Sequence, residues 1–503
     1  MDLTQVKKAG IIGAGVAGLA SARVLLSQGI SCTLFERNAT LGGVWANGYV
    51  NFGVQVQKEL YEYPDWPLPN DTPNFTPGPI VQKYLEGYAD HFGVIPHIRF
   101  NAAVEGLEPR DGPEAGWRVN YNDGNGVKQD EFDLIVISIG LYSNVPNMPR
   151  FPGQDGFQGK IMHISDFKSL DQLKDKRVVV LGFGKSATDA AVESASTAKQ
   201  TAIVFREAHW PVPRKLAGLV PFKWGMLHRM TSTLLPLYQR PTPVERVVHT
   251  LGKPLVWLWW RSIELLLILQ CRLWSRFGTR ESLTPSAPIE IDAFGESTML
   301  PRPQFYRLLR SGDIDPHRTE IAEYAETRVV LKNGKSLDAD IVILAAGWKT
   351  EYGFLSEKVK FAIQFEDDGL YLYRQMVHPD APNMVFIGAA STIASMLTYS
   401  LQARWLGELI KGRHTLPPPE EMRREIEDMK AWKRSWMPFS PARSARLLAH
   451  MLHYHDELLE DFGANPNRKT GWLAPLKELI FPYEPNDYRT IVSGDWEKLE
   501  KQA

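Results

Sequence analysis

A glycine-rich turn near the start of the chain has the residue types and spacing of a dinucleotide site. It reads Gly13-Ala14-Gly15-Val16-Ala17-Gly18, and the pair Glu36-Arg37 begins eighteen residues after Gly18. Glycines at this spacing permit a tight turn and let a pyrophosphate approach a helix N-terminus, where free N–H groups and the helix dipole favour an anion. A carboxylate at Glu36 would accept hydrogen bonds from a ribose 2′-OH and repel a 2′-phosphate. The motif predicts a site for FAD or NAD, not NADP, that involves Gly13, Gly15, Gly18, Glu36 and Arg37.

A second glycine turn follows about 170 residues later and ends on a different charge. It reads Gly182-Phe183-Gly184-Lys185-Ser186-Ala187, and Arg206 stands where the first turn has its acid. A guanidinium there can pair bidentately with a 2′-phosphate, and Lys185 adds a cation near the phosphates, so the turn favours NADPH. Two alternatives stay open: Arg206 as a solvated surface residue, and Ser186 and Asp189 as simple helix caps.

Two dinucleotide sites on one chain predict hydride transfer between a nicotinamide and a flavin. The next electron acceptor follows by elimination. The two cysteines, Cys32 and Cys271, have no partner near them in sequence, and no Cys or His spacing indicates a metal or iron–sulfur centre. Oxygen or a diffusible oxidant remains as the acceptor of electrons from the reduced flavin.

The strands and helices expected on either side of the two glycine turns predict an α/β fold with two Rossmann-type dinucleotide-binding domains. Apolar runs at Ala9–Ile12, Ser31–Phe35, Arg177–Leu181 and Thr201–Phe205 read as strands, with helical periodicity after each glycine turn. We expect an FAD domain at 1–155 and 325–415, an NADPH domain at 156–324 with a helical Trp- and Leu-rich insertion at about 210–300, and a helical C-terminal extension at 416–503.

The amino-acid composition limits the classes of binding partner and the cellular location that we expect. The 57 Lys and Arg against 58 Asp and Glu give a net charge of −1, so no overall basic field attracts nucleic acid. Two cysteines in 503 residues favour a reducing, cytoplasmic location. The sequence carries no signal for an oligomeric state.

The apolar stretch Leu255–Trp274 is not expected to span a bilayer, because Arg261, Glu264 and Arg272 interrupt it. Three interpretations stay open, in this order: a core helix of the insertion, a lid over a lipophilic substrate, or an interfacial helix in peripheral contact with a membrane. The first two combine into helices that pack on the domains and line the substrate entrance.

Several motifs together resemble the flavin-containing monooxygenase family. Leu41-Gly42-Gly43-Val44-Trp45 is similar to the segment that lies along FAD, and residues 157–167, FQGKIMHISDF, match the fingerprint FxGxxxHxxx(Y/F) just before the second glycine turn. The Baeyer–Villiger version of this fingerprint ends in Trp followed by Pro or Asp, and Phe167-Lys168 departs from it. The usual ATG(Y/F) segment reads Ala345-Ala346-Gly347-Trp348, without the threonine hydroxyl.

The resemblance implies roles for individual residues. FAD is expected to contact Gly43, Val44, Trp45, the backbone of Val104, and Gly388 in the family-like segment Phe386-Ile387-Gly388. NADPH is expected to contact Gly182, Gly184, Lys185, Ser186, Asp189 and Arg206. Gln55 takes the place beside the flavin where many relatives have Asn. Arg302 is a candidate active-site cation, with a surface salt bridge as the alternative. His163 is expected to hydrogen-bond backbone and hold the two domains in register.

The resemblance also implies a reaction. Reduced FAD would add O₂ to give a C4a-(hydro)peroxyflavin, which would oxygenate a small, lipophilic organic substrate at N, S or C. The alternatives are Baeyer–Villiger oxygenation of a ketone and a non-oxygenating FAD- and NADPH-binding regulatory role.

Overall fold

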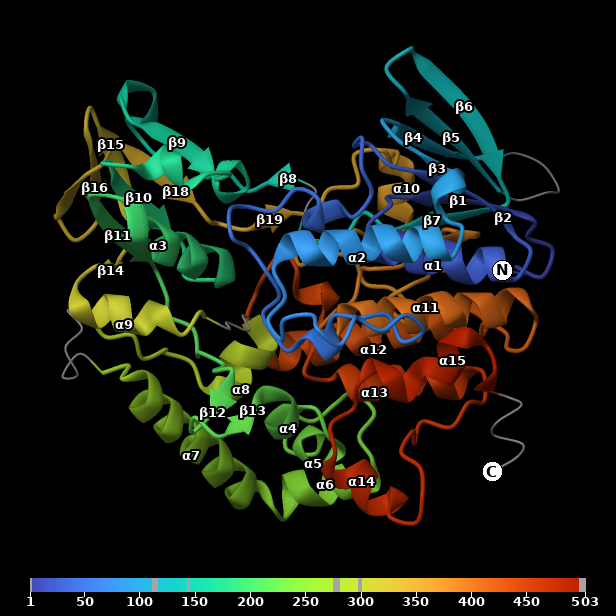
Figure 1. Ribbon diagram of the computed structural model, residues 1–503. Coiled ribbons are helices and arrows are strands. Elements are labelled where there is room, and N and C mark those ends of the chain that lie inside the picture. The colour runs from blue at the N-terminus through green and yellow to red at the C-terminus, as the bar shows by residue number, and fades with distance from the viewer. Residues whose placement is uncertain (1, 111–115, 143–144, 275–280, 297–300, 497–503) are drawn as a thin grey trace.

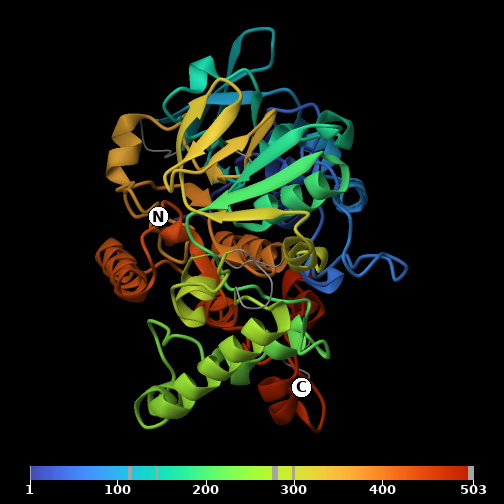
Figure 2. The same cartoon turned by 90° about the vertical axis from the view of Figure 1, so that its left-hand side faces the viewer.

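The computed structural model describes residues 2–110, 116–142, 145–274, 281–296 and 301–496. Two five-stranded parallel sheets form the upper half of the molecule in Figure 1, one at each side. Helices of the insertion and of the C-terminal region lie beneath them, as the view in Figure 2 also shows.

The first sheet holds the first glycine turn. Its strand order is β20-β7-β1-β2-β3, and each neighbouring pair is parallel. Its central strands are buried on both faces, which explains the continuous apolar runs in the sequence. Helices α1 and α11 pack together against this unit, with α2 beside them. The bounds are β1 (Lys8–Ile12), β2 (Ser31–Phe35), β3 (Ile98–Arg99), β7 (Leu134–Ile137), β20 (Met384–Phe386), α1 (Val16–Ser27), α2 (Gly78–His91) and α11 (Ser395–Ile410).

The second sheet repeats this arrangement. Its order is β14-β11-β10-β18-β9, again parallel throughout, so β10 and β11 take the places that β1 and β2 take in the first sheet. The predicted duplication and the α/β fold class are therefore confirmed. The bounds are β9 (Lys160–His163), β10 (Arg177–Leu181), β11 (Gln200–Phe205), β14 (Asp315–Arg318), β18 (Ile341–Leu344), α3 (Lys185–Thr197) and α9 (Gln304–Ser311).

Each unit also carries a three-stranded antiparallel sheet, inserted before β7 in the first unit and before β18 in the second. In the first unit this sheet is β4 (Ala103–Pro109), β5 (Trp117–Asn122) and β6 (Val127–Phe132); in the second it is β15 (Ile321–Ala325), β16 (Arg328–Leu331) and β17 (Ser336–Asp338).

The predicted return to the first domain at residue 325 is wrong. β18 pairs with β9 and β10, so the second unit continues through Leu344. The chain crosses between the units on one short antiparallel pair, β8 (Val145–Pro146) with β19 (Trp348–Lys349). The remaining helix of the first unit is α10 (Glu357–Ala362).

The C-terminal region is part of the first unit's core rather than a separate extension. The largest hydrophobic cluster contains Leu3 and Val24 of the first unit together with Met422, Leu458 and Trp496. Helix α13 packs on α11, and β22 pairs with β21. The bounds are α12 (Pro419–Trp436), α13 (Met451–Asp461), α14 (Ala474–Ile480), α15 (Arg489–Ser493), β21 (Ser391–Thr392) and β22 (Arg446–Leu448).

The insertion is helical, as predicted, but its longest helix is not a core helix. Only Trp260, Leu267, Ile268 and Cys271 are buried among the 19 residues of α7. The other side chains of α7 are not buried because the helix packs on the protein along one side only. The insertion comprises β12 (Lys215–Leu216), β13 (Val220–Pro221), α4 (Phe222–Met226), α5 (Arg229–Ser232), α6 (Pro243–Thr250), α7 (Lys253–Cys271) and α8 (Ile289–Ile291).

Candidate functional site

The first glycine turn forms a narrow backbone cradle at the carboxyl end of β1. Gly13 has φ +100°, and a Cβ there would lie 2.6 Å from the Ser138 carbonyl oxygen. A Cβ on Gly18 would lie 1.9 Å from the Gly13 carbonyl oxygen, so the helix can approach the strand only without one. Gly15 faces Gly43, and Cβ atoms built on the two would lie 3.8 and 3.5 Å from the opposite Cα. The 3₁₀ turn Gly43–Trp45 is held here because the Gly42 N–H donates to the Ala14 carbonyl at 2.9 Å.

The N-terminus of α1 presents backbone donors that no side chain caps. Helix α1 has Gly15 at its N-cap, without a capping side chain and without an acid in its first turn. The α1 N-terminus therefore fits a pyrophosphate. Glu36 is buried at the end of β2, where its carboxylate accepts the Ala14 N–H at 3.0 Å and the Asn38 side-chain amide at 2.7 Å. Ala102 donates its N–H to the Glu36 carbonyl at 2.9 Å, which brings β4 and Val104 to the ribose end of the cradle.

An aromatic group follows the cradle along the chain. The ring of Trp45 stacks on Phe52 with centroids 5.8 Å apart and meets the edge of Tyr61 at 5.7 Å. Burial raises the pKa of Tyr61 to about 12, and the backbone of Gln55 hydrogen-bonds its hydroxyl. Gln55 is half-buried and its backbone lies at Tyr61, and its place beside the flavin stays a prediction.

The second glycine turn repeats the cradle with opposite charge at the ribose end. Gly182 has φ +125°, and a Cβ on Gly184 would meet nothing within 4 Å, so a ligand can approach the backbone there. Helix α3 has Gly184 at its N-cap, again without a capping side chain. Arg206 follows β11 with its side chain 79% exposed and an ion-pair distance of 4.0 Å to Glu320. This open guanidinium and the free helix end fit a phosphorylated dinucleotide.

Asp189 contacts protein side chains from both units, and its predicted contact with NADPH stays a prediction. Its fully buried carboxylate accepts the Tyr49 hydroxyl at 2.8 Å, pairs with Lys185, and lies 3.0 Å from the Arg302 Nε. Burial lowers the pKa of Lys185, which the adjacent carboxylate opposes. Tyr49 belongs to the first unit and Asp189 to the second, so this cluster joins the two units.

Arg302 is a bridging residue rather than a surface salt bridge. Its guanidinium pairs with Asp189 and Glu193 on α3 and donates to the Asn51 carbonyl of the first unit. The Asn51 side-chain amide donates to Glu193 at 2.9 Å. These contacts indicate a positioning role for Arg302, because Asp189 and Glu193 both pair with its guanidinium, and its catalytic role stays a prediction.

We expect Arg302→Ala to lower the free energy of unfolding by about 3 kcal/mol, because removing one partner leaves a buried carboxylate short of its countercharge. Thermal unfolding without added cofactor measures this. Arg150→Ala is the matched control, since Arg150 is exposed and pairs with the exposed Asp155. Unchanged unfolding together with lost turnover would restore the catalytic assignment.

The fingerprint segment joins the units at a second place. The His163 Nε2–H donates to the Gly347 carbonyl at 3.1 Å, and the ring packs on Trp348 with ring centroids 4.8 Å apart. Phe167 is fully buried, and its carbonyl accepts the Val50 N–H at 2.7 Å. Lys168 donates to the Asn47 and Gly48 carbonyls at 2.8 Å. The backbone role predicted for His163 agrees with these contacts.

Several residues lie elsewhere than expected or were missed. Gly388 packs on Ala17, and its N–H donates to Gln402 at 3.1 Å, so it supports α1 rather than offering a free donor. Tyr49 and Asn51 were missed, because nothing in the sequence marks a contact across 140 residues.

Cys32 and Cys271 are buried free thiols, and burial raises the pKa of each to about 12, so neither is a reactive thiolate.

The geometry can be compared with known proteins. The sequence model of the family described as "Flavin-binding monooxygenase-like" matches residues 6–248 and 309–502. The chain belongs to this family. With that membership the expected class, an NADPH-dependent flavin monooxygenase with FAD as its flavin, is confirmed.

Members of the family with curated names are similar over nearly the whole chain. Human "Flavin-containing monooxygenase 1" is 31% identical over 98% of this chain and 90% of its own length. "Probable flavin-containing monooxygenase 1" of Arabidopsis thaliana is 29% identical over 100% of this chain and 99% of its own length.

Solved structures share the fold. S-allyl-L-cysteine S-oxygenase from Allium sativum gives a TM-score of 0.63 at 19% identity, over 98% of this chain and 94% of that one. An oxidised steroid monooxygenase bound to NADP gives 0.67 at 19% identity, over 94% of this chain and 98% of that one.

Proposed function

We propose that this chain binds FAD in the cradle of Gly13, Gly15 and Gly43 and NADPH in the cradle of Gly182 and Gly184, and oxygenates a small, lipophilic organic substrate. The observation that carries this assignment is the opposite charge at the two ribose ends. Glu36 is an acceptor for a 2′-OH at the first cradle, and Arg206 is an exposed cation for a 2′-phosphate at the second.

When bound, the flavin supplies the electrons that activate O₂. The chain's own residues orient the cofactors and keep water from the reacting atoms. The rings of Trp45, Phe52 and Tyr61 provide an apolar wall, and the half-buried Gln55, whose backbone lies at Tyr61, supplies a polar amide beside it. The bridge of Tyr49, Asp189 and Arg302 holds the two cradles in one orientation. No side chain is needed as a nucleophile.

The oxygenated atom distinguishes the candidate reactions. The fingerprint ends in a buried Phe167, which departs from the Baeyer–Villiger version and favours oxygenation of N, S or electron-rich C. NADPH oxidation should be followed with a panel of amines, thioethers and ketones, with product mass measured under isotope-labelled O₂. We expect amines or thioethers to gain one labelled oxygen. Esters formed from ketones would instead support Baeyer–Villiger chemistry, and NADPH oxidation that no compound stimulates would support the regulatory role.

Arg206→Glu should raise the KM for NADPH about 10- to 100-fold while leaving the KM for NADH nearly unchanged, because only NADPH carries the 2′-phosphate. Steady-state flavin reduction with each nucleotide measures this. Arg318, one strand away, pairs with Glu207 and serves as the control in an Arg318→Ala variant. An equal rise in KM for both nucleotides would show that Arg206 does not bind the 2′-phosphate.

We also propose a cytoplasmic location. The two buried thiols suit a reducing compartment, and fractionation of cells that express the tagged protein tests it. Recovery of the protein from a secreted fraction would contradict this.

A further inference from the structure

Arg446 on β22 is a half-buried arginine without a carboxylate partner. Its Nε is buried and makes no hydrogen bond, and its Nη2 donates only to the Ser440 hydroxyl, at 3.5 Å. Among the residues that the structure describes, no carboxylate lies within 4.0 Å of its guanidinium. The buried Arg374 differs, because its Nε and Nη2 hold Asp461 at 2.8 and 2.9 Å. Arg446 therefore has donors for an anion that the fold itself does not supply.

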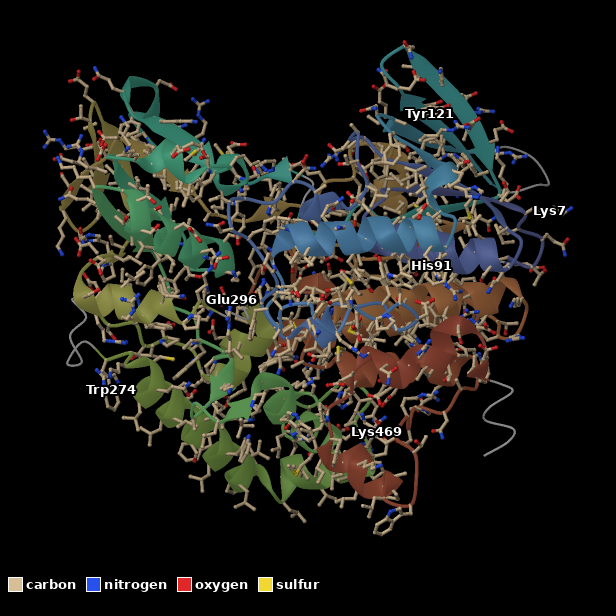
Figure 3. The ribbon with its side chains drawn as sticks, in the orientation of Figure 1. Lys7, His91, Tyr121, Trp274, Glu296 and Lys469 are labelled. Carbon is tan, nitrogen blue, oxygen red and sulfur yellow. The ribbon has the colours of Figure 1, made fainter. Side chains whose placement is uncertain are left out.

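The acids that act on Arg446 electrostatically lie beyond ion-pair distance. Burial lowers the pKa of Arg446, and Glu296 and Asp292 are among the groups that oppose this shift. The Asp292 carboxylate already bonds the His209 Nδ1 at 2.7 Å and accepts the Trp210 N–H at 2.6 Å. Glu296 ends the turn Asp292–Glu296, and Figure 3 labels it between the second sheet and the insertion helices. A charge withdrawn from water without a partner is costly, so a bound anion would stabilise it.

The fold places Arg446 at the carboxyl edge of the first sheet. Strand β22 runs parallel to β21, with Arg446 opposite Ser391. The Tyr142 and Ser391 hydroxyls lie 3.0 Å apart. Tyr142 follows β7 and Ser391 follows β20, and these two strands are parallel neighbours. Ligands of open α/β sheets bind outside this edge, where the cradle of Gly13 also lies. Arg446 is therefore on the same edge as the proposed flavin site.

Aromatic rings connect this edge with the proposed flavin site. Tyr142 is 57% exposed, so the edge is open to solvent at this residue. Burial raises the pKa of Tyr61 and of Tyr399, and the nearby Tyr142 hydroxyl contributes to both shifts. Tyr61 in turn meets the ring of Trp45 with centroids 5.7 Å apart. A molecule that enters past Tyr142 therefore finds aromatic rings on the side of the cradle and the cation of Arg446 on the side of β22.

We infer that Arg446 binds a carboxylate of the substrate, so that the substrates of this chain are apolar amines or thioethers with a carboxylate at one end. The inference rests on the proposed oxygenation and adds the substrate class to it. A guanidinium pairs with a carboxylate through two parallel hydrogen bonds, which also orient the bound molecule. A phosphate is the less favoured ligand, because it needs more charge than the single cation of Arg446 supplies.

Matched acids and esters test the inference on the holoenzyme. With 3-(phenylthio)propanoate and its methyl ester, we expect NADPH-dependent sulfoxide formation with a kcat/KM about 10- to 100-fold higher for the acid, the range that a charge-assisted hydrogen bond contributes. Arg446→Met keeps the length of the side chain without its charge, so the acid should lose this advantage. Arg446→Lys keeps the charge without the two parallel donors and should retain part of it. Arg424→Met, at an exposed arginine of α12, is the control and should keep the wild-type ratio.

A binding measurement separates this inference from the proposed function. 4-Phenylbutanoate has no sulfur or nitrogen to oxygenate, and it should raise the unfolding temperature of the wild type but not of Arg446→Met, whereas 4-phenylbutanol should raise neither. Such binding without oxygenation of any thioether would support the carboxylate site and contradict the proposed function. Equal kcat/KM for acid and ester in the wild type would overturn the inference and leave the function standing. Loss of flavin from Arg446→Met would also overturn it and assign the guanidinium to the cofactor.

Discussion

Gly15→Val should give a folded protein that purifies without flavin colour. Gly15 has an extended backbone that any residue adopts, and its added Cβ would meet the Gly43 backbone at ordinary contact distance, with the Cα at 3.8 Å and the nitrogen at 4.0 Å. The fold therefore accepts a side chain here, but the side chain fills the space through which the pyrophosphate reaches the α1 N-terminus. Flavin absorbance per mole of protein measures the loss, and circular dichroism measures folding.

Two other glycines make the test specific. Gly184→Val in the second cradle meets nothing within 4 Å and should keep its yellow colour while NADPH no longer reduces the flavin. Gly18→Ala places a Cβ 1.9 Å from the Gly13 carbonyl oxygen and should fail to fold. Gly15 is a cleaner probe than Glu36, whose removal also leaves the buried Ala14 N–H without an acceptor. A yellow Gly15→Val protein with full flavin content would refute the placement of FAD.

Gln55→Ala should uncouple NADPH consumption from oxygenation. The amide of Gln55 is the polar group proposed to donate to the reacting oxygen or to bound NADP⁺, and removal of one such donor typically costs about 10²–10³ in rate. We expect product formation to fall by about that factor while NADPH is still consumed and H₂O₂ is released. The ratio of product to NADPH, with H₂O₂ assayed in parallel, measures the coupling.

Conservative variants decide whether Gln55 acts through its amide. Gln55→Asn keeps the amide and shortens its reach, so it should lose less coupling than Gln55→Ala. Gln57→Ala, two residues later in the same loop, should keep the wild-type ratio. If Gln55→Ala also keeps that ratio, the position is structural and the loop does not lie against the flavin.

Local signals in the sequence were enough to predict the two cradles. The requirement for glycine at Gly13 and Gly18 arises within a few residues, from a positive φ and a close carbonyl, and the strand-end charge at Glu36 or Arg206 follows at a fixed distance. The duplicated sheet order follows from the same repeated unit, because right-handed crossovers between parallel strands leave few arrangements.

Long-range contacts could not be predicted in the same way. The bond between Tyr49 and Asp189 joins residues 140 positions apart, and neither residue type is unusual at its position. The boundary after Leu344 was missed because β18 is as apolar as a strand of either sheet. Helix α7 was expected to be buried because apolar composition alone does not distinguish a core helix from one that lies on a surface.

The path of the chain has a consequence for its synthesis. The second unit is one continuous stretch from β9 to β18, whereas the first unit needs β20, α11 and residues as late as Trp496 to close its core around Leu3. A ribosome therefore releases a complete second unit while the first still lacks a sheet edge and a covering layer. Folding on the ribosome should reverse the order of the sequence, and the flavin can be enclosed only after translation has ended.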